Sequence, residues 1–162
     1  MNYEELKRYC IHVLPIRAVN SETFDLPKEY NAIIICAETD NQFIYSCEPE
    51  NTLKMNFRDV ENKSAPNAFH KADAERIINF VLNLPDEVTD IYVCCSQGVS
   101  RSPAIAAFLL KASGRNDMVV WRNPYYSPNT LVYALLCQEY GIRSSLKVRR
   151  IVNKRAFRSI QK

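Results

Sequence analysis

Short apolar runs of the length of a β-strand recur along the chain. They cover residues 10–16, 31–37, 52–57 and 91–94. The first two are rich in β-branched residues, and the third alternates apolar with polar positions, the period expected of a strand with one buried face. The pattern therefore predicts four strands.

Apolar residues at helical spacing occupy the segments between and after these runs. The segment 67–85 keeps this spacing until its final proline, which stops a helix. A second helix is predicted to start near residue 102, with Pro103 in its first turn and Gly114 just past its end. A third runs from an N-cap at Asn129 to Gly141. Strands that alternate with helices predict an α/β fold with a central, mostly parallel sheet flanked by helices.

Length and charge predict one domain with a basic end. The chain has 162 residues, of which 47% are hydrophobic, enough for one core and too few for two ordinary domains. Residues 146–162 contain seven basic residues and no acidic one; subtracting these from the net charge of +3 leaves −4 on the rest. We expect a domain over residues 1–145 and a basic tail or last helix over 146–162. Such a tail is either a solvated end or a contact for anions, membrane surfaces or nucleic acid.

The cysteines and histidines indicate a reduced protein without a metal. The six cysteines form no CxxC pair and no dense framework, which favours a reducing, cytoplasmic setting. The start of the chain is charged, and no run approaches the roughly 18 apolar residues that cross a bilayer. We expect neither secretion nor membrane insertion. The two histidines, His12 and His70, lack suitable partners, so no metal or cofactor is expected.

One motif contains several candidate reactive and anion-binding residues. The stretch "YVCCSQGVSRSP", residues 92–103, places a short loop between a strand and a helix. The free N–H groups and the positive dipole end of a helix N-terminus attract an anion. The same field stabilises the reactive thiolate form of a cysteine at the start of the loop. Arg101 adds a planar guanidinium that can hold two oxygens of a phosphate.

The segment from Cys95 to Ser102, "CSQGVSRS", resembles the HCxxGxxRS active-site signature of cysteine-dependent protein phosphatases, and most closely that of small dual-specificity phosphatases. The resemblance implies the fold of that family, with Cys95 as the nucleophile and Arg101 as the phosphate clamp. It implies that Ser102 donates a hydrogen bond to the sulfur and helps the phosphoenzyme to break down. The residues implied to bind phosphate are Ser96, Gln97, Gly98, Val99, Ser100 and Arg101.

The residue before the nucleophile departs from the signature. The family has histidine where this chain has Cys94. Side chains alternate along a strand, so Cys94 is expected on the face opposite to Cys95, in the core. In the family that histidine orients the loop and supports the thiolate, so its absence puts the rate in doubt, though not the binding of phosphate.

The chemistry also needs a proton donor for the leaving oxygen. Asp59 ends the alternating strand and faces the loop if that strand is parallel to the motif strand. It precedes Cys95 by 36 residues, in a segment that resembles the general-acid loop of the family. Asp59 is the predicted acid, with Glu61 as the alternative. Pro128 and Asn129 resemble the start of a late helix of the family and are interpreted as architecture.

The substrate follows from the variable positions of the loop, which contain no lysine and no second arginine. Relatives that hydrolyse inositol phosphates commonly have basic residues there, so the expected substrate is a phosphoprotein. Phosphotyrosine is favoured, and dual specificity stays open. Two alternatives remain: a phosphate-binding pseudophosphatase, because of Cys94, and an RNA 5′-phosphatase, because of the tail. Trp121, Tyr125 and Tyr126 either line a phosphotyrosine cleft or pack, and packing is favoured.

Overall fold

The structure of the chain is a computed structural model that describes residues 3–19, 30–39 and 51–144. The predicted basic tail lies outside the described residues. The strands are β1 (Cys10–Pro15), β2 (Asn31–Ala37), β3 (Asn51–Asn56) and β4 (Asp90–Cys95). The helices are α1 (Tyr3–Lys7), α2 (Ile16–Val19), α3 (Lys71–Leu82), α4 (Arg101–Ala112), α5 (Met118–Trp121) and α6 (Thr130–Tyr140).

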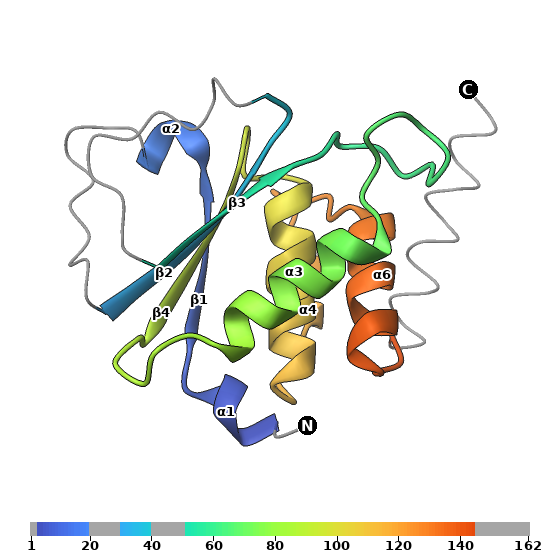
Figure 1. The fold of residues 1–162 in the computed structure, drawn as a ribbon. Coiled ribbons are helices and arrows are strands. Elements are labelled where there is room, and N and C mark those ends of the chain that lie inside the picture. The colour runs from blue at the N-terminus through green and yellow to red at the C-terminus, as the bar shows by residue number, and fades with distance from the viewer. Residues whose placement is uncertain (1–2, 20–29, 40–50, 145–162) are drawn as a thin grey trace.

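The described strands form one parallel sheet in the order β1-β4-β2-β3 (Figure 1). β4, which leads into the motif, lies between β1 and β2. Cys95 is in register with Pro15 on one side and Cys36 on the other. The carboxyl ends of these strands therefore meet at one edge of the sheet, which is where open α/β sheets bind ligands. The predicted α/β fold with a parallel sheet is confirmed.

The two faces of the sheet are buried differently. Figure 1 shows α3, α4 and α6 together on one side, and α2 on the other. Cys36 and Cys95 belong to the large core on the side of the three helices. Ile35 and Cys94 belong to a smaller apolar cluster that includes residues of α2. The prediction that Cys94 and Cys95 point to opposite faces is thus confirmed.

The residues at the ends of α4 and α6 explain why the sequence was sufficient to predict these two helices. α4 has Pro103 in its first turn, and Gly114 follows it with φ of +71°. α6 begins after Asn129, whose side chain accepts from the N–H of Val132 at 3.1 Å, and it ends at Gly141 with φ of +78°. Only glycine adopts this left-handed conformation at little cost. The short helices α1, α2 and α5 were not predicted. Each has only four or five residues, which is too short for the spacing of apolar residues along a helix to be recognised.

Residues 67–70 do not join the helix predicted over 67–85. α3 begins at Lys71, because the carboxylate of Asp73 accepts a hydrogen bond of 2.9 Å from the backbone N–H of His70. This reciprocal capping satisfies an amide at the helix start and fixes the boundary there. None of the helices in the described ranges is long and apolar enough to cross a membrane.

Candidate active site

The motif loop, residues 96–100, turns continuously between β4 and α4. Gly98 lies at its middle with φ of +69°, in the left-handed region. A Cβ atom at this position would come within 3.0 Å of the backbone nitrogen of Pro15 and 3.1 Å of the carbonyl carbon of Leu14. Both the conformation and the close approach to β1 therefore require glycine. This packing keeps the loop curled against the end of β1.

Most backbone N–H groups of the loop have no hydrogen-bond acceptor among the described residues. Gly98 donates to the carbonyl of Cys95 at 3.3 Å. Within the described part of the chain, it is the only residue from Ser96 to Ser100 whose backbone N–H donates to a protein acceptor. The loop leads directly into the N-terminus of α4, whose N-cap is Ser100 and whose dipole favours a negative charge. Such a set of amides provides hydrogen-bond donors for a bound anion.

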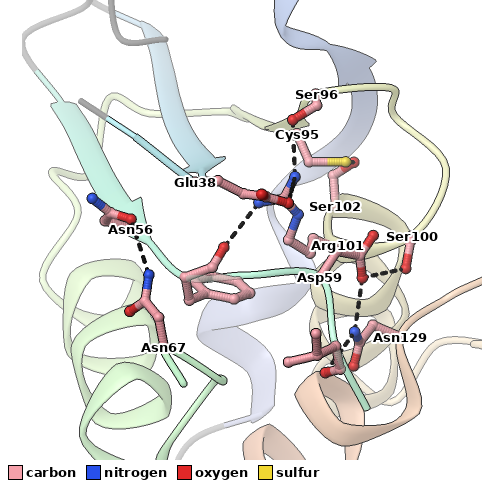
Figure 2. Close-up of polar contacts among 12 residues, drawn as sticks. Glu38, Asn56, Asp59, Asn67, Cys95, Ser96, Ser100, Arg101, Ser102 and Asn129 are labelled. Carbon is pink, nitrogen blue, oxygen red and sulfur yellow. Dashed lines mark hydrogen bonds and ion pairs between the residues drawn. The ribbon is translucent and has the colours of Figure 1, made fainter. Parts of the chain in front are cut away.

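Cys95 ends β4 at the base of this loop and is 2% exposed. Ser102, in the first turn of α4, donates a hydrogen bond from its hydroxyl to the sulfur of Cys95 at 3.0 Å. A hydroxyl that donates to sulfur stabilises negative charge on it. The contact that the resemblance implied for Ser102 is therefore present (Figure 2).

Arg101, 3% exposed, lies directly after the loop. One terminal nitrogen of its guanidinium donates to the carbonyl oxygen of Phe57 and the other to the hydroxyl of Ser96, both at 2.9 Å. The remaining nitrogen, Nε, is buried and has no hydrogen-bond partner among the described residues. A buried donor without a partner is costly unless a ligand satisfies it. This side chain is therefore held in place with one donor available to an anion.

Glu38 is a member of the site that sequence reasoning missed. Its carboxylate lies 3.8 Å from the guanidinium of Arg101, and its side chain is 46% exposed (Figure 2). The residue directly follows β2, next to β4 in the sheet, so its place at the carboxyl edge was the signal that could have found it. Phe57, whose carbonyl holds Arg101, follows β3 and belongs to the run 52–57, which was interpreted only as a strand.

Two further cysteines flank Cys95 without sharing its surroundings. Cys36 is next to it in register on β2, and burial raises the pKa of the Cys36 thiol well above its usual value. Burial likewise raises the pKa of Cys94, with a smaller contribution from the neighbouring Cys95. Both therefore remain neutral thiols near neutral pH. Of the three, only Cys95 receives the Ser102 hydroxyl.

Asp59 follows β3 and reaches the other end of the loop. The hydroxyl of Ser100 and the side-chain amide of Asn129 both donate to the same oxygen, Oδ1, each at 2.8 Å. Figure 2 shows the carboxylate between these two residues. The structure thus places Asp59 at the loop, as the sequence predicted, because β3 and β4 are both parallel to β2 and so run in the same direction. Its role as the acid stays a prediction.

Glu61, the alternative acid, has a different partner. Its carboxylate accepts a hydrogen bond of 3.0 Å from the backbone N–H of Thr130, the first residue of α6. A carboxylate at a helix N-terminus satisfies a free amide and complements the dipole. Glu61 therefore caps α6, whereas Asp59 contacts the loop.

The aromatic residues near the motif divide between core and surface. Trp121 is buried with its ring edge-on to that of Tyr133, and Tyr126 is partly buried against the core. Tyr125 is 80% exposed, so the expectation that it packs is wrong for this residue. Its backbone N–H donates to the side chain of Asn123, which holds the residue in a turn at the surface.

The histidines lie in structural contacts. His12 on β1 stacks on Tyr92 at 4.4 Å between ring centroids, and its Nε2 lies 2.7 Å from a carboxylate oxygen of Asp90. His70 precedes α3. Over the described ranges, no three His, Cys, Asp or Glu side chains are placed to hold a metal ion.

Comparison with known proteins finds likeness in structure and not in sequence. No protein-family model matches the chain, and no curated protein matches it significantly. Thirteen chains of solved structures do match. The structure of Tk-PTP in its active form superposes with a TM-score of 0.51 at 14% identity, covering 83% of this chain and 92% of Tk-PTP. PTPMT1, solved in complex with PI(5)P, gives a TM-score of 0.47 at 15% identity, covering 77% of this chain and 80% of PTPMT1.

The chain therefore has the fold of the protein tyrosine phosphatases. It is the fold implied by the resemblance of residues 95–102 to the signature of cysteine-dependent phosphatases. At such low identity the likeness concerns the fold alone. Activity depends on the side chains that the fold brings together.

Proposed function

We propose that this protein is a phosphatase that hydrolyses phosphate monoesters through a cysteinyl-phosphate intermediate. The observation that carries the proposal is the arrangement around one loop: the sulfur of Cys95 at its base, the buried guanidinium of Arg101, and the carboxylate of Asp59 bound to Ser100. A nucleophile, an anion clamp and an acid are the three groups that this reaction needs.

In the first step the thiolate of Cys95 attacks phosphorus, and the bond from phosphorus to the leaving oxygen breaks. The proton that this oxygen requires comes from the carboxyl group of Asp59. The loop amides and the free Nε of Arg101 donate to the phosphoryl oxygens and stabilise the charge in the transition state. The products are an alcohol or phenol and a phosphate bound to Cys95.

In the second step water displaces the sulfur. The carboxylate of Asp59 takes a proton from the water, which attacks phosphorus and releases inorganic phosphate. The sulfur leaves as a thiolate, and the hydroxyl of Ser102 stabilises it through the existing hydrogen bond. Asp59 is then protonated again and ready for the next substrate.

The proposed substrate is a phosphoprotein, with phosphotyrosine favoured. The loop positions between Cys95 and Arg101 carry no cationic side chain for a second phosphate. Glu38 adds a half-exposed negative charge beside the guanidinium, which opposes a multiply phosphorylated ligand. Both features favour a substrate with a single phosphate group.

The first test is hydrolysis of p-nitrophenyl phosphate by the full chain and by a Cys95→Ser variant. Activity that disappears in the variant supports the phosphatase. Retention of phosphate binding without any turnover in the wild-type protein would instead support a pseudophosphatase, the alternative that Cys94 in place of histidine suggests. Both proteins should have matched unfolding temperatures, so that a loss cannot come from misfolding.

The second test compares substrates at equal concentration. Phosphate release is measured from a phosphotyrosine peptide, a phosphoserine or phosphothreonine peptide, vesicles with a singly phosphorylated inositol lipid, and 5′-triphosphorylated RNA. The proposal expects the phosphotyrosine peptide to have the highest kcat/KM. A preference for the vesicles or the RNA would contradict the proposed substrate class. Deletion of residues 146–162 should leave peptide hydrolysis intact, whereas RNA binding through the tail would weaken steeply with salt.

A further inference from the structure

Asn129 joins three segments of the site with one buried side chain and its backbone. Its Oδ1 accepts from Val132 in the first turn of α6, and its Nδ2 donates to the carboxylate of Asp59 at 2.8 Å and to the carbonyl of Val60 at 3.2 Å. Its backbone N–H donates to the carbonyl of Ser100 in the motif loop at 3.1 Å. The residue is 1% exposed.

Helix capping accounts for only part of these contacts. An N-cap needs an acceptor for one of the first amides of the helix, and serine, aspartate and asparagine serve about equally well. Oδ1 meets that requirement at Val132. The amide nitrogen does nothing for the helix, because both of its bonds go to residues 59–60, in the chain segment that follows β3.

The contacts of Asp59 show what the amide controls. Asn129 and Ser100 both donate to Oδ1, and within the described part of the chain no donor contacts the second oxygen, Oδ2. Two donors on one oxygen fix the rotation of the carboxylate and leave the other oxygen to carry a proton. The bond from Asn129 to the carbonyl of Val60 holds the adjacent backbone as well.

We propose that Asn129 is a positioning residue for proton transfer, which holds Asp59 so that Oδ2 meets the leaving oxygen of the substrate. The inference rests on the proposed function, in which Asp59 is the acid. It goes beyond the interpretation of Asn129 as architecture, because it assigns the Nδ2 group to the chemical step. Ser100 is the second anchor of the same carboxylate oxygen.

The test separates the donor from the cap. Asn129→Ser keeps an N-cap acceptor and removes Nδ2, so the helix start is retained. Because a hydrogen bond to a charged group is lost, kcat for an alkyl phosphate, a poor leaving group, should fall about 10- to 100-fold. The rate with p-nitrophenyl phosphate, whose leaving group needs little protonation, should change by no more than about twofold. Equal losses for both substrates would overturn the inference.

A double-mutant cycle supplies the control. If Asn129 acts through Asp59, the serine substitution should have little further effect on the alkyl phosphate in an Asp59→Asn background. Losses that multiply instead would show that Asn129 acts through the general structure of the site, and would overturn the inference. Should the serine variant fail to fold, Asn129→Asp keeps the shape and the cap but replaces the donor with a carboxylate, and the same selective loss is expected.

The same data distinguish this inference from the proposed function. Absence of Cys95-dependent hydrolysis in the wild-type protein would overturn both. Cys95-dependent hydrolysis that is lost selectively for the poor leaving group in Asp59→Asn but not in Asn129→Ser would overturn only the positioning role. The inference is supported if both variants lose rate selectively with the poor leaving group.

Discussion

The hydroxyl of Ser102 and the sulfur of Cys95 are joined by a hydrogen bond of 3.0 Å, although the two residues lie at opposite ends of the motif loop. One ends β4 and the other lies in the first turn of α4. The bond closes the loop on itself and directs the sulfur toward the amides at the start of the helix. Both side chains are buried, so water competes little for this contact.

The first prediction concerns this bond. Ser102→Ala should slow the breakdown of the cysteinyl phosphate, because the departing thiolate loses its donor. A hydrogen bond to a charged group corresponds to about 1.5–3 kcal/mol, so steady-state turnover should fall about 10- to 100-fold. Rapid-mixing kinetics with p-nitrophenyl phosphate should show a burst of p-nitrophenol followed by a slower steady state. A variant with wild-type turnover and no burst would contradict the role of Ser102.

The second prediction concerns the glycine of the loop, with a matched control at the end of α6. Gly98 and Gly141 both have left-handed backbone, but of the two only Gly98 has atoms within 4 Å of the position that a Cβ would occupy. Either change to alanine should lower the free energy of unfolding by about 1–2 kcal/mol. Only Gly98→Ala should also abolish hydrolysis and weaken phosphate binding, because the loop must move away from Pro15. Equal activity of the two variants would contradict the proposed function of the loop.

Much of this arrangement followed from the sequence because its signals are local. The strand, loop and helix around Cys95 are consecutive, and Pro103 and Gly114 mark the limits of α4. Asp59 could be placed because a parallel sheet brings strand ends to one edge. A short sequence pattern and one rule of sheet topology were thus sufficient to predict where these residues lie.

The contacts that were missed depend on separations that no local pattern encodes. Glu38 contacts Arg101 from the position after β2, and the amide of Asn129 contacts Asp59 across 70 positions of the sequence. An asparagine just before a helix is expected as an N-cap. The sequence therefore contains no separate indication that the side-chain amide of Asn129 also contacts Asp59. Three-dimensional contacts were needed to find these links.

The third prediction uses the differing surroundings of the cysteines. Iodoacetate near neutral pH should alkylate Cys95, and inorganic phosphate should protect it. Burial raises the pKa of Cys94, so its thiol should stay unmodified even at mildly alkaline pH while the protein is folded. Peptide mapping by mass spectrometry measures both sites, and labelling after unfolding is the control for detection. Alkylation of Cys94 ahead of Cys95 would contradict the assignment of the nucleophile.

The fourth prediction concerns stability against acid at the far end of the sheet. The hydroxyl of Thr89 donates to Asp90 at 2.6 Å and, together with the contact of His12, holds the pKa of that carboxyl below its ordinary value. The unfolded chain therefore takes up the proton first as the pH falls. The stabilising contribution is complete above about pH 4 and is lost as the pH drops through the pKa of the folded state.

An Asp90→Asn variant tests this sign. Near neutral pH it should unfold more easily than the wild-type protein, by at most about 1 kcal/mol because the site is partly solvated. The difference should shrink toward zero in acid, as measured by urea unfolding over a pH series. A difference that grows as the pH falls would contradict the direction of the pKa shift.

The most direct test of the central claim is to trap the intermediate. The wild-type protein is mixed with p-nitrophenyl phosphate, quenched in acid within the first turnovers, digested and analysed by mass spectrometry. The proposed function predicts a phosphate on Cys95, absent from Cys95→Ser and enriched in Ser102→Ala. Turnover that persists in Cys95→Ser, or a phosphate found on another residue, would contradict it.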